Sequence, residues 1–241
     1  MKNKYVLIVL LAFIFSGCAN SVVFVSGTQS HQKLKTEICK TVELEYLLYT
    51  PDNYSETDEK LPLLLFLHGS GERGNDLNKV KVHGPPKLIE EGKKFPFIVV
   101  SPQCPEGKWW SIEDLEALLN NIIEQYKVDE DRIYLTGLSM GGFGTWEFAI
   151  EFPGKFAAIA PVCGGGNKFA VDRIKHIPIW VFHGAKDNVV KPEQSEVMVE
   201  ALEKVGSDVK FTLYPEATHN SWTETYNNED LYNWFLEQKR K

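Results

Sequence analysis

The sequence predicts an α/β fold in which helices cover both faces of a mostly parallel sheet. Short apolar runs of strand length alternate with helical segments along nearly the whole chain. This alternation is typical of parallel strands joined by crossover helices. The chain has 241 residues, of which 43% are hydrophobic and 24% charged, and it has no internal repeat. These values suit one ordinary globular domain.

The first predicted elements are three strands and a helix. Residues 41–51 alternate apolar and polar side chains, as in a half-buried strand. The runs 61–69 and 96–102 are continuously apolar, as in strands that are buried on both faces. Apolar residues then recur at helical spacing over 111–126, and Ser111 is in position to cap that helix.

The second half of the chain continues the alternation to its end. Strands are expected at 132–137, 156–163, 177–184 and 209–215, and helices at 139–153, 191–206 and 229–239. In a sheet of this kind the reactive groups lie on loops at the carboxyl ends of the strands. Residues that follow strands are therefore the first candidates for a functional site.

The N-terminus has the pattern of an export signal. Lysines precede an apolar run over 5–15, and Ser16 and Gly17 stand before Cys18. The run is too short to span a bilayer but suits the core of a secretory signal. The small residues before a cysteine resemble the lipobox of bacterial lipoproteins, although Phe15 stands where leucine is usual. A plain signal peptide or an uncleaved anchor is the alternative.

This pattern predicts three parts of the chain. They are a lipoprotein signal peptide at 1–17, a tether at 18–40 and a catalytic domain at 41–241. Lipidation of Cys18 would attach the exported protein to a bacterial membrane, in the periplasm or at the cell surface.

Charge and cysteine content limit the partners. The formal net charge is −7 and the basic residues are scattered, which argues against a nucleic-acid partner. No Cys/His spacing resembles a zinc site, so no metal or cofactor is expected. Besides Cys18 the chain has Cys39, Cys104 and Cys163. Cys104 and Cys163 follow predicted core strands, so they could form a disulfide, and buried free thiols are the alternative.

Ser139 is the candidate nucleophile. It follows the predicted strand 132–137 and lies between Gly137 and Gly141. Glycines permit a turn that is too sharp for a Cβ atom at either position. A serine at the tip of a strand–turn–helix unit has the arrangement of a nucleophile elbow. Because G-x-S-x-G also occurs by chance, the rest of the chain has to supply the partners.

Those partners occur in the order that such a site requires. Asp187 and His219 follow the last two predicted strands, which gives the chain order Ser, Asp, His. We expect His219 to take the proton of Ser139 and to pass it to the leaving group, while Asp187 orients the imidazole. His183, at a strand end near Asp187, is interpreted as structural.

An oxyanion hole needs two further donors. One is the backbone amide of Met140, at the start of the helix behind the serine. The other is expected from the glycine-rich loop 68–74, where we assign the amide of Ser70, with Gly71 as the alternative. His68 is expected to shape this loop.

Four segments together resemble the α/β-hydrolase superfamily. They are residues 61–74, 101–110, 129–165 and 181–190. Within that superfamily they are similar to the polyhydroxybutyrate-depolymerase-like and feruloyl or acetylxylan esterase group, which includes lipoproteins labelled predicted peptidases. The resemblance covers about residues 42–238. It implies an α/β-hydrolase fold with Ser139 as nucleophile, Asp187 as acid and His219 as base.

The expected function is that of a secreted, lipid-anchored serine esterase that releases acetyl or feruloyl groups from plant polysaccharide such as xylan. The short connection 163–176 leaves little or no room for a lid, which suits a large soluble substrate. Trp109, Trp110 and Trp222 fall on or near the predicted site loops and could stack on sugar or phenolic rings, although core packing is an equal alternative.

Two other functions are compatible with the same sequence features. The same three residues would serve a serine peptidase or a general short-chain carboxylesterase. A surface lipoprotein that binds glycans without catalysis is the third interpretation, and the complete set of catalytic residues argues against it.

Overall fold

The computed structural model describes residues 33–240. The chain divides into two units, with the boundary between Lys40 and Thr41. In the first unit the described residues, 33–40, are exposed and form neither helix nor strand. The predicted signal peptide and Cys18 lie outside the described residues. No helix among the residues described is long and apolar enough to cross a membrane.

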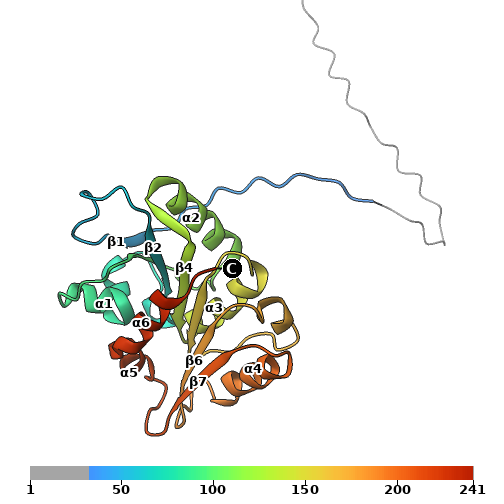
Figure 1. The fold of residues 1–241 in the computed structure, drawn as a ribbon. Coiled ribbons are helices and arrows are strands. Elements are labelled where there is room, and N and C mark those ends of the chain that lie inside the picture. The colour runs from blue at the N-terminus through green and yellow to red at the C-terminus, as the bar shows by residue number, and fades with distance from the viewer. Residues whose placement is uncertain (1–32, 241) are drawn as a thin grey trace, which may run out of the picture. The chain divides into compact units, whose positions relative to one another are not determined.

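The second unit is built on a seven-stranded sheet (Figure 1). The strands are β1 (Tyr46–Tyr49), β2 (Leu61–Leu67), β3 (Ile98–Pro102), β4 (Val128–Leu138), β5 (Ala158–Val162), β6 (Ile179–Gly184) and β7 (Val209–Tyr214). Their order across the sheet is β1-β3-β2-β4-β5-β6-β7. Only the edge pair β1–β3 is antiparallel among these strands. The predicted mostly parallel sheet is therefore confirmed.

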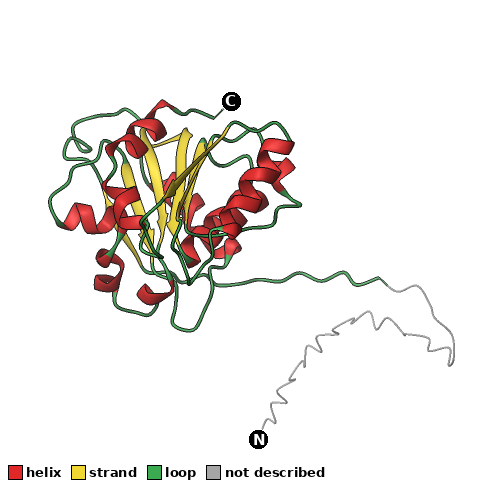
Figure 2. Ribbon diagram, turned by 90° about the horizontal axis from the view of Figure 1, so that it is seen from below, coloured by secondary structure: helices red, strands yellow, loops and turns green. Residues whose placement is uncertain are grey.

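Helices cover both faces of the sheet, as Figure 2 shows. The helices are α1 (Gly84–Glu90), α2 (Ile112–Gln125), α3 (Met140–Glu151), α4 (Glu193–Lys204), α5 (Trp222–Asn227) and α6 (Glu229–Glu237). Short 3₁₀ turns lie at Ser70–Glu72, Leu77–Val82 and Val171–Ile174. The predicted cap is present, since the Ser111 hydroxyl accepts the amide of Asp114 at 3.3 Å.

The alternation of side chains along β2 divides the core into two layers. Leu63 and Leu65 pack with the buried sides of α2, α3 and α4, whereas Leu64 and Phe66 pack with those of α5 and α6. Successive side chains of a strand point to opposite faces, so a strand covered on both sides must be apolar throughout. This explains the continuous apolar run that predicted β2.

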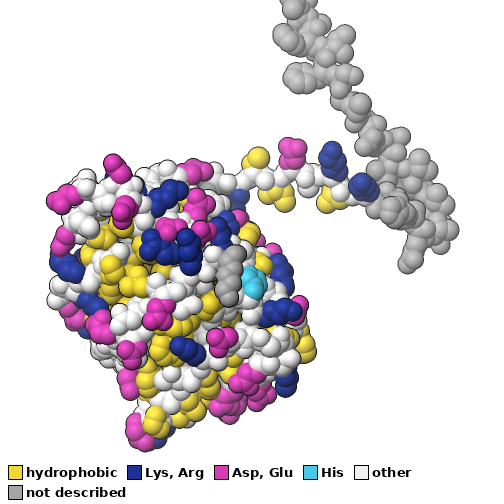
Figure 3. Space-filling model, in the orientation of Figure 1, with side chains coloured by type: hydrophobic (Ala, Val, Ile, Leu, Met, Phe, Trp, Pro, Cys, Tyr) yellow, Lys and Arg dark blue, Asp and Glu magenta, His cyan; other side chains and the backbone are white. Residues whose placement is uncertain are grey.

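Charges of both signs share the surface. Figure 3 shows lysine and arginine side chains interspersed with aspartate and glutamate over the face in view, with apolar side chains between them. Ion pairs such as Lys87–Glu91 and Lys93–Glu229 join neighbouring charges. The basic groups on this face therefore lie among acidic ones and form no continuous stripe.

Candidate active site

Ser139 occupies a strained turn between β4 and α3. Its backbone has φ 52° and ψ −116°, a left-handed conformation that residues with a side chain rarely adopt. The flanking glycines permit the close approach of neighbouring chain segments. A Cβ atom at Gly141 would overlap the carbonyl oxygen of Leu67 and come within 2.8 Å of the His68 carbonyl oxygen. The turn therefore requires glycine there and holds the serine at the carboxyl end of β4.

The three residues expected to act together lie within hydrogen-bond distance. The Ser139 Oγ is 3.0 Å from Nε2 of His219, and Nδ1 of His219 is 2.7 Å from Oδ2 of Asp187. Since a carboxylate only accepts, the imidazole donates from Nδ1 and leaves Nε2 free to accept the serine hydroxyl. Strand ends of β4, β6 and β7 thus bring together residues that are up to 80 positions apart.

Asp187 is buried and held from several directions. Its Oδ1 accepts the amides of Val189 at 2.9 Å and Val190 at 3.0 Å. Its Oδ2 lies 3.3 Å from Nε2 of His183, in addition to the bond from His219. These contacts leave the carboxylate one orientation, which in turn fixes the plane of the His219 ring.

His183 contributes more to this site than its sequence context suggested. The ring is fully buried, with Nε2 2.8 Å from the carbonyl oxygen of Val190 and Nδ1 2.7 Å from Oγ of Ser195. It therefore connects the loop that carries Asp187 to helix α4. Its position four residues before Asp187, at the end of a strand, was the only signal available in the sequence.

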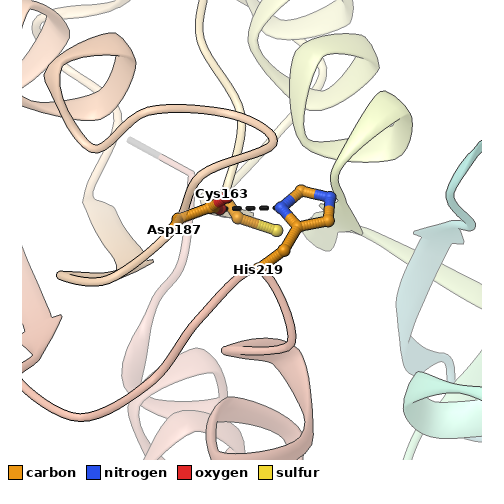
Figure 4. Close-up of side chains that lie close together, drawn as sticks. All are labelled: Cys163, Asp187 and His219. Carbon is orange, nitrogen blue, oxygen red and sulfur yellow. Dashed lines mark hydrogen bonds and ion pairs between the residues drawn. The ribbon is translucent and has the colours of Figure 1, made fainter.

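Cys163 lies against the Asp187–His219 pair. Figure 4 shows its sulfur pointing toward the His219 ring, and possible ligand atoms of the three residues lie within 4.8 Å of one another. Burial raises the pKa of the Cys163 thiol to about 12. Cys163 and Cys104 are both buried and free, so the alternative of a disulfide between them is not realised.

The loop after β2 is positioned by its own side chains. Nδ1 of His68 is 2.6 Å from the carbonyl oxygen of Gly69, and Nε2 accepts the amide of Cys104 at 2.9 Å. The carbonyl of Gly69 and the amide of Ser70 share one planar peptide group and point in opposite directions. By holding the carbonyl, His68 therefore fixes the direction of the Ser70 amide.

The two expected oxyanion donors remain available. Among the described residues, neither the amide of Ser70 nor that of Met140 donates to another protein group. Ser70 begins a 3₁₀ turn and Met140 begins α3, so both amides are the unpaired first donors of a helical segment. Arg73 braces the loop by donating to the Ser70 carbonyl at 2.9 Å.

The buried His68 should make the fold sensitive to acid. Burial lowers the pKa of His68 to about 4, below an unfolded value of about 6.5. The unfolded chain therefore binds a proton that the folded chain rejects, and stability falls as the pH drops from about 6.5 to 4. The loss from this group should approach about 3 kcal/mol.

Urea unfolding from pH 7 to pH 4.5 should show a shallower decline in the free energy of unfolding for His68→Asn than for wild type. An equal decline in both would contradict the assignment, and exposed His176→Asn is the control.

The three tryptophans have different surroundings. Trp109 is 53% exposed and contacts Phe143 edge-to-face, with ring centroids 6.1 Å apart. The Trp222 ring lies 5.2 Å from that of His219. Trp110 is buried, and its indole N–H donates to the carbonyl of His68 at 3.3 Å. Trp222 thus lies beside His219 and Trp109 lies exposed beside Phe143 of α3, whereas Trp110 packs beneath the loop.

A parallel sheet with a serine elbow, and with Asp and His at later strand ends, defines an α/β-hydrolase. The model of the dienelactone hydrolase family matches residues 107–233, and this chain belongs to that family. The resemblance stated from the sequence is confirmed at the level of the superfamily and its esterases.

Several relatives are esterases. The bifunctional acetylxylan esterase/xylanase XynS20E of Neocallimastix patriciarum is 31% identical over 157 residues, covering 62% of this chain and 22% of that protein. "Probable feruloyl esterase C" of Aspergillus oryzae is 28% identical over 184 residues, covering 73% of this chain and 63% of that protein. A thermostable esterase of known crystal structure is 39% identical with a TM-score of 0.71, and the match covers 83% of this chain and 60% of that one. The chain spans less than two thirds of each of these proteins.

Proposed function

We propose that this protein hydrolyses esters through an acyl-enzyme formed on Ser139. The observation that supports this is the pair of short contacts at the site. Ser139 Oγ lies 3.0 Å from Nε2 of His219, and Nδ1 of His219 lies 2.7 Å from Oδ2 of Asp187. Ser139 Oγ attacks the ester carbonyl carbon while Nε2 of His219 takes its proton. The amides of Ser70 and Met140 receive the negative charge that develops on the carbonyl oxygen.

His219 then acts as an acid to complete acylation, and as a base again when water removes the acyl group. His219 gives its proton to the departing alcohol, which leaves the acyl group on Ser139. A water molecule then loses a proton to His219 and attacks the acyl carbon, and the released serine oxygen recovers that proton. Asp187 stabilises the imidazolium in both steps. The sequence of bonds made and broken needs no metal or cofactor.

The proposed substrate is an acetyl or feruloyl ester on plant polysaccharide such as xylan. The printed names of relatives include acetylxylan esterase and feruloyl esterase. The described connection from β5 to β6 contains a 3₁₀ turn, Val171–Ile174, and no inserted lid element. An open site suits an acyl group on a large polymer, and exposed Trp109 offers a surface for a ring of the substrate.

Export and lipid anchoring complete the proposal. The apolar run before Cys18 supports a signal peptide at 1–17, a tether at 18–40 and the catalytic domain at 41–241. An "uncharacterized secreted protein" of Arthroderma benhamiae is 26% identical over 200 residues. A lipid on Cys18 would hold the enzyme at a bacterial membrane, where it would meet polymer outside the cytoplasm.

Acid release from polymer tests this function. Acetylated xylan and feruloylated xylan are incubated with wild type and with Ser139→Ala, and free acetate and ferulate are measured. Release by wild type alone would support both mechanism and substrate class. Cleavage of a simple activated ester with no release from either polymer would contradict the substrate class. Hydrolysis of peptides without any ester would favour the peptidase alternative.

Trp109 should favour aromatic acyl groups. We expect Trp109→Ala to lower kcat/KM for feruloyl esters about three- to tenfold relative to acetyl esters, because an aromatic contact is lost. Steady-state kinetics on matched feruloyl and acetyl esters provide the ratio. Phe169→Ala, which removes an aromatic ring that is 88% exposed, is the matched control. An equal fall for both acyl groups would count against a stacking role.

A further inference from the structure

Glu72 is a largely buried side chain, and one of its two carboxylate oxygens lacks a hydrogen-bond donor among the described residues. The residue is 9% exposed, and its Oε2 is inaccessible and unpartnered among the described residues. His68 lies 3.9 Å from Oε2, but its Nδ1 proton is used on the carbonyl oxygen of Gly69. His83 Nε2 is 3.9 Å from Oε1, which is too long for a hydrogen bond. A buried carboxylate in this state is costly unless another group donates to it.

The position of this carboxylate makes the cost larger for an esterase. Glu72 ends the 3₁₀ turn that begins with Ser70, and Oε2 lies 3.1 Å from the place of a Cβ atom on Gly69. A negative charge beside the oxyanion loop opposes the negative charge that develops in the transition state. Oε2 itself is inaccessible, so a donor that arrives with the substrate would bind Oε1 and reduce the charge of the carboxylate as a whole during the reaction.

The gap between Glu72 and His83 lies on the His219 side of the site. The ring of His83 is 5.3 Å from that of Trp222, and the ring of Trp222 is 5.2 Å from that of His219. Because His219 delivers the proton to the departing alcohol, the alcohol part of the ester leaves on this side. A ligand group in the gap therefore belongs to the alcohol and not to the acyl group.

The geometry of the gap selects a hydroxyl group. An oxygen about 2.8 Å from both Glu72 Oε1 and His83 Nε2 fits between atoms that are 3.9 Å apart. A hydroxyl can donate to the carboxylate and at the same time accept from the imidazole N–H. A carboxylate ligand would be repelled by Glu72, and an ammonium group cannot accept from His83.

We propose that Glu72 and His83 form a subsite for a free hydroxyl next to the esterified carbon of a sugar. This inference rests on the proposed function, since it takes the alcohol part of the substrate to be a carbohydrate. Glu72 then determines specificity for the alcohol, by a hydrogen bond that a simple alkyl or aryl ester cannot make.

A matched pair of substrates tests the subsite. Both are monoacetylated methyl xylosides, one with the neighbouring hydroxyl free and one with that hydroxyl methylated. The ratio of kcat/KM for the two is measured for wild type, Glu72→Ala, Glu72→Gln and the control Glu56→Gln, whose side chain is exposed. Because each ratio compares two substrates on one protein, a reduced folded fraction cancels.

We expect wild type and Glu56→Gln to prefer the free hydroxyl about tenfold or more, since the acceptor is charged. The preference should disappear in Glu72→Ala and be intermediate in Glu72→Gln, whose amide oxygen still accepts. A ratio near one in wild type, or the same preference in Glu72→Ala, would overturn the subsite while leaving the esterase function intact. Activity on a simple ester with none on either xyloside would overturn the substrate class, and the subsite with it.

Discussion

Ser139→Ala is expected to lower kcat/KM for ester hydrolysis by about 10⁴-fold or more, with the folded structure retained. Alanine keeps the Cβ atom and removes only Oγ, the atom that lies 3.0 Å from His219. Without this oxygen no acyl-enzyme can form, and the remaining groups can only bind and polarise the ester. The measurement is initial-rate hydrolysis of an activated acetyl ester by purified proteins.

The matched control is Ser55→Ala, which removes an exposed serine hydroxyl elsewhere and should behave as wild type. A fluorophosphonate probe adds an independent measurement, because it should label wild type and Ser55→Ala but not Ser139→Ala. Circular dichroism verifies that the three proteins share one fold. Covalent labelling of Ser139→Ala, or turnover close to wild type, would exclude Ser139 as the nucleophile.

Gly141→Ala should have the largest effect on stability. The added Cβ atom would overlap the carbonyl oxygen of Leu67 and approach that of His68, and both belong to the end of β2 and the loop after it. Backbone at the centre of a sheet cannot rotate away as a flexible side chain can. We expect a loss of about 3 kcal/mol or more in the free energy of unfolding, measured by urea denaturation.

Gly154→Ala provides the control for this change. No atom lies within 4 Å of a Cβ built there, so its stability should stay within about 0.5 kcal/mol of wild type. If Gly141→Ala fails to give soluble protein while Gly154→Ala expresses normally, the same conclusion holds. Equal stability of both variants would contradict the close packing of the serine turn against β2.

The catalytic residues could be predicted because each one depends on local order along the chain. Ser139 is flanked by glycines after an apolar run, and Asp187 and His219 each follow a later run. Parallel strands place all their carboxyl ends at one edge of the sheet, so chain order was enough to bring the three residues together. Their roles as nucleophile, acid and base remain predictions until the variants are assayed.

Other features depend on contacts between segments that are distant in the chain. Trp109 and Trp110 are neighbours in the sequence, and only the packed structure shows that the first is exposed and the second buried. The facing of Glu72 and His83 arises where two 3₁₀ turns and their loops pack together. No periodicity in the sequence reports such a contact, so neither residue was a candidate.

Helix α1 was not predicted for a different reason. Pro85 and Pro86 stand in its first turn, where the missing N–H groups cause no loss, although prolines in an unassigned segment usually suggest a loop. The edge position of β1 and its antiparallel pairing with β3 also depend on the packing of the finished sheet. Local sequence patterns carry no information on that choice.

The left-handed backbone of Ser139 also bears on why this residue persists. A non-glycine residue in such a conformation costs about 1–3 kcal/mol, and glycine at the same position would avoid most of that cost. A substitution of the serine by glycine would therefore relieve strain at the cost of the hydroxyl. Ser139 and Cys163 are the described non-glycine residues with positive φ, and both lie at this site, so backbone strain is concentrated where we propose the chemistry.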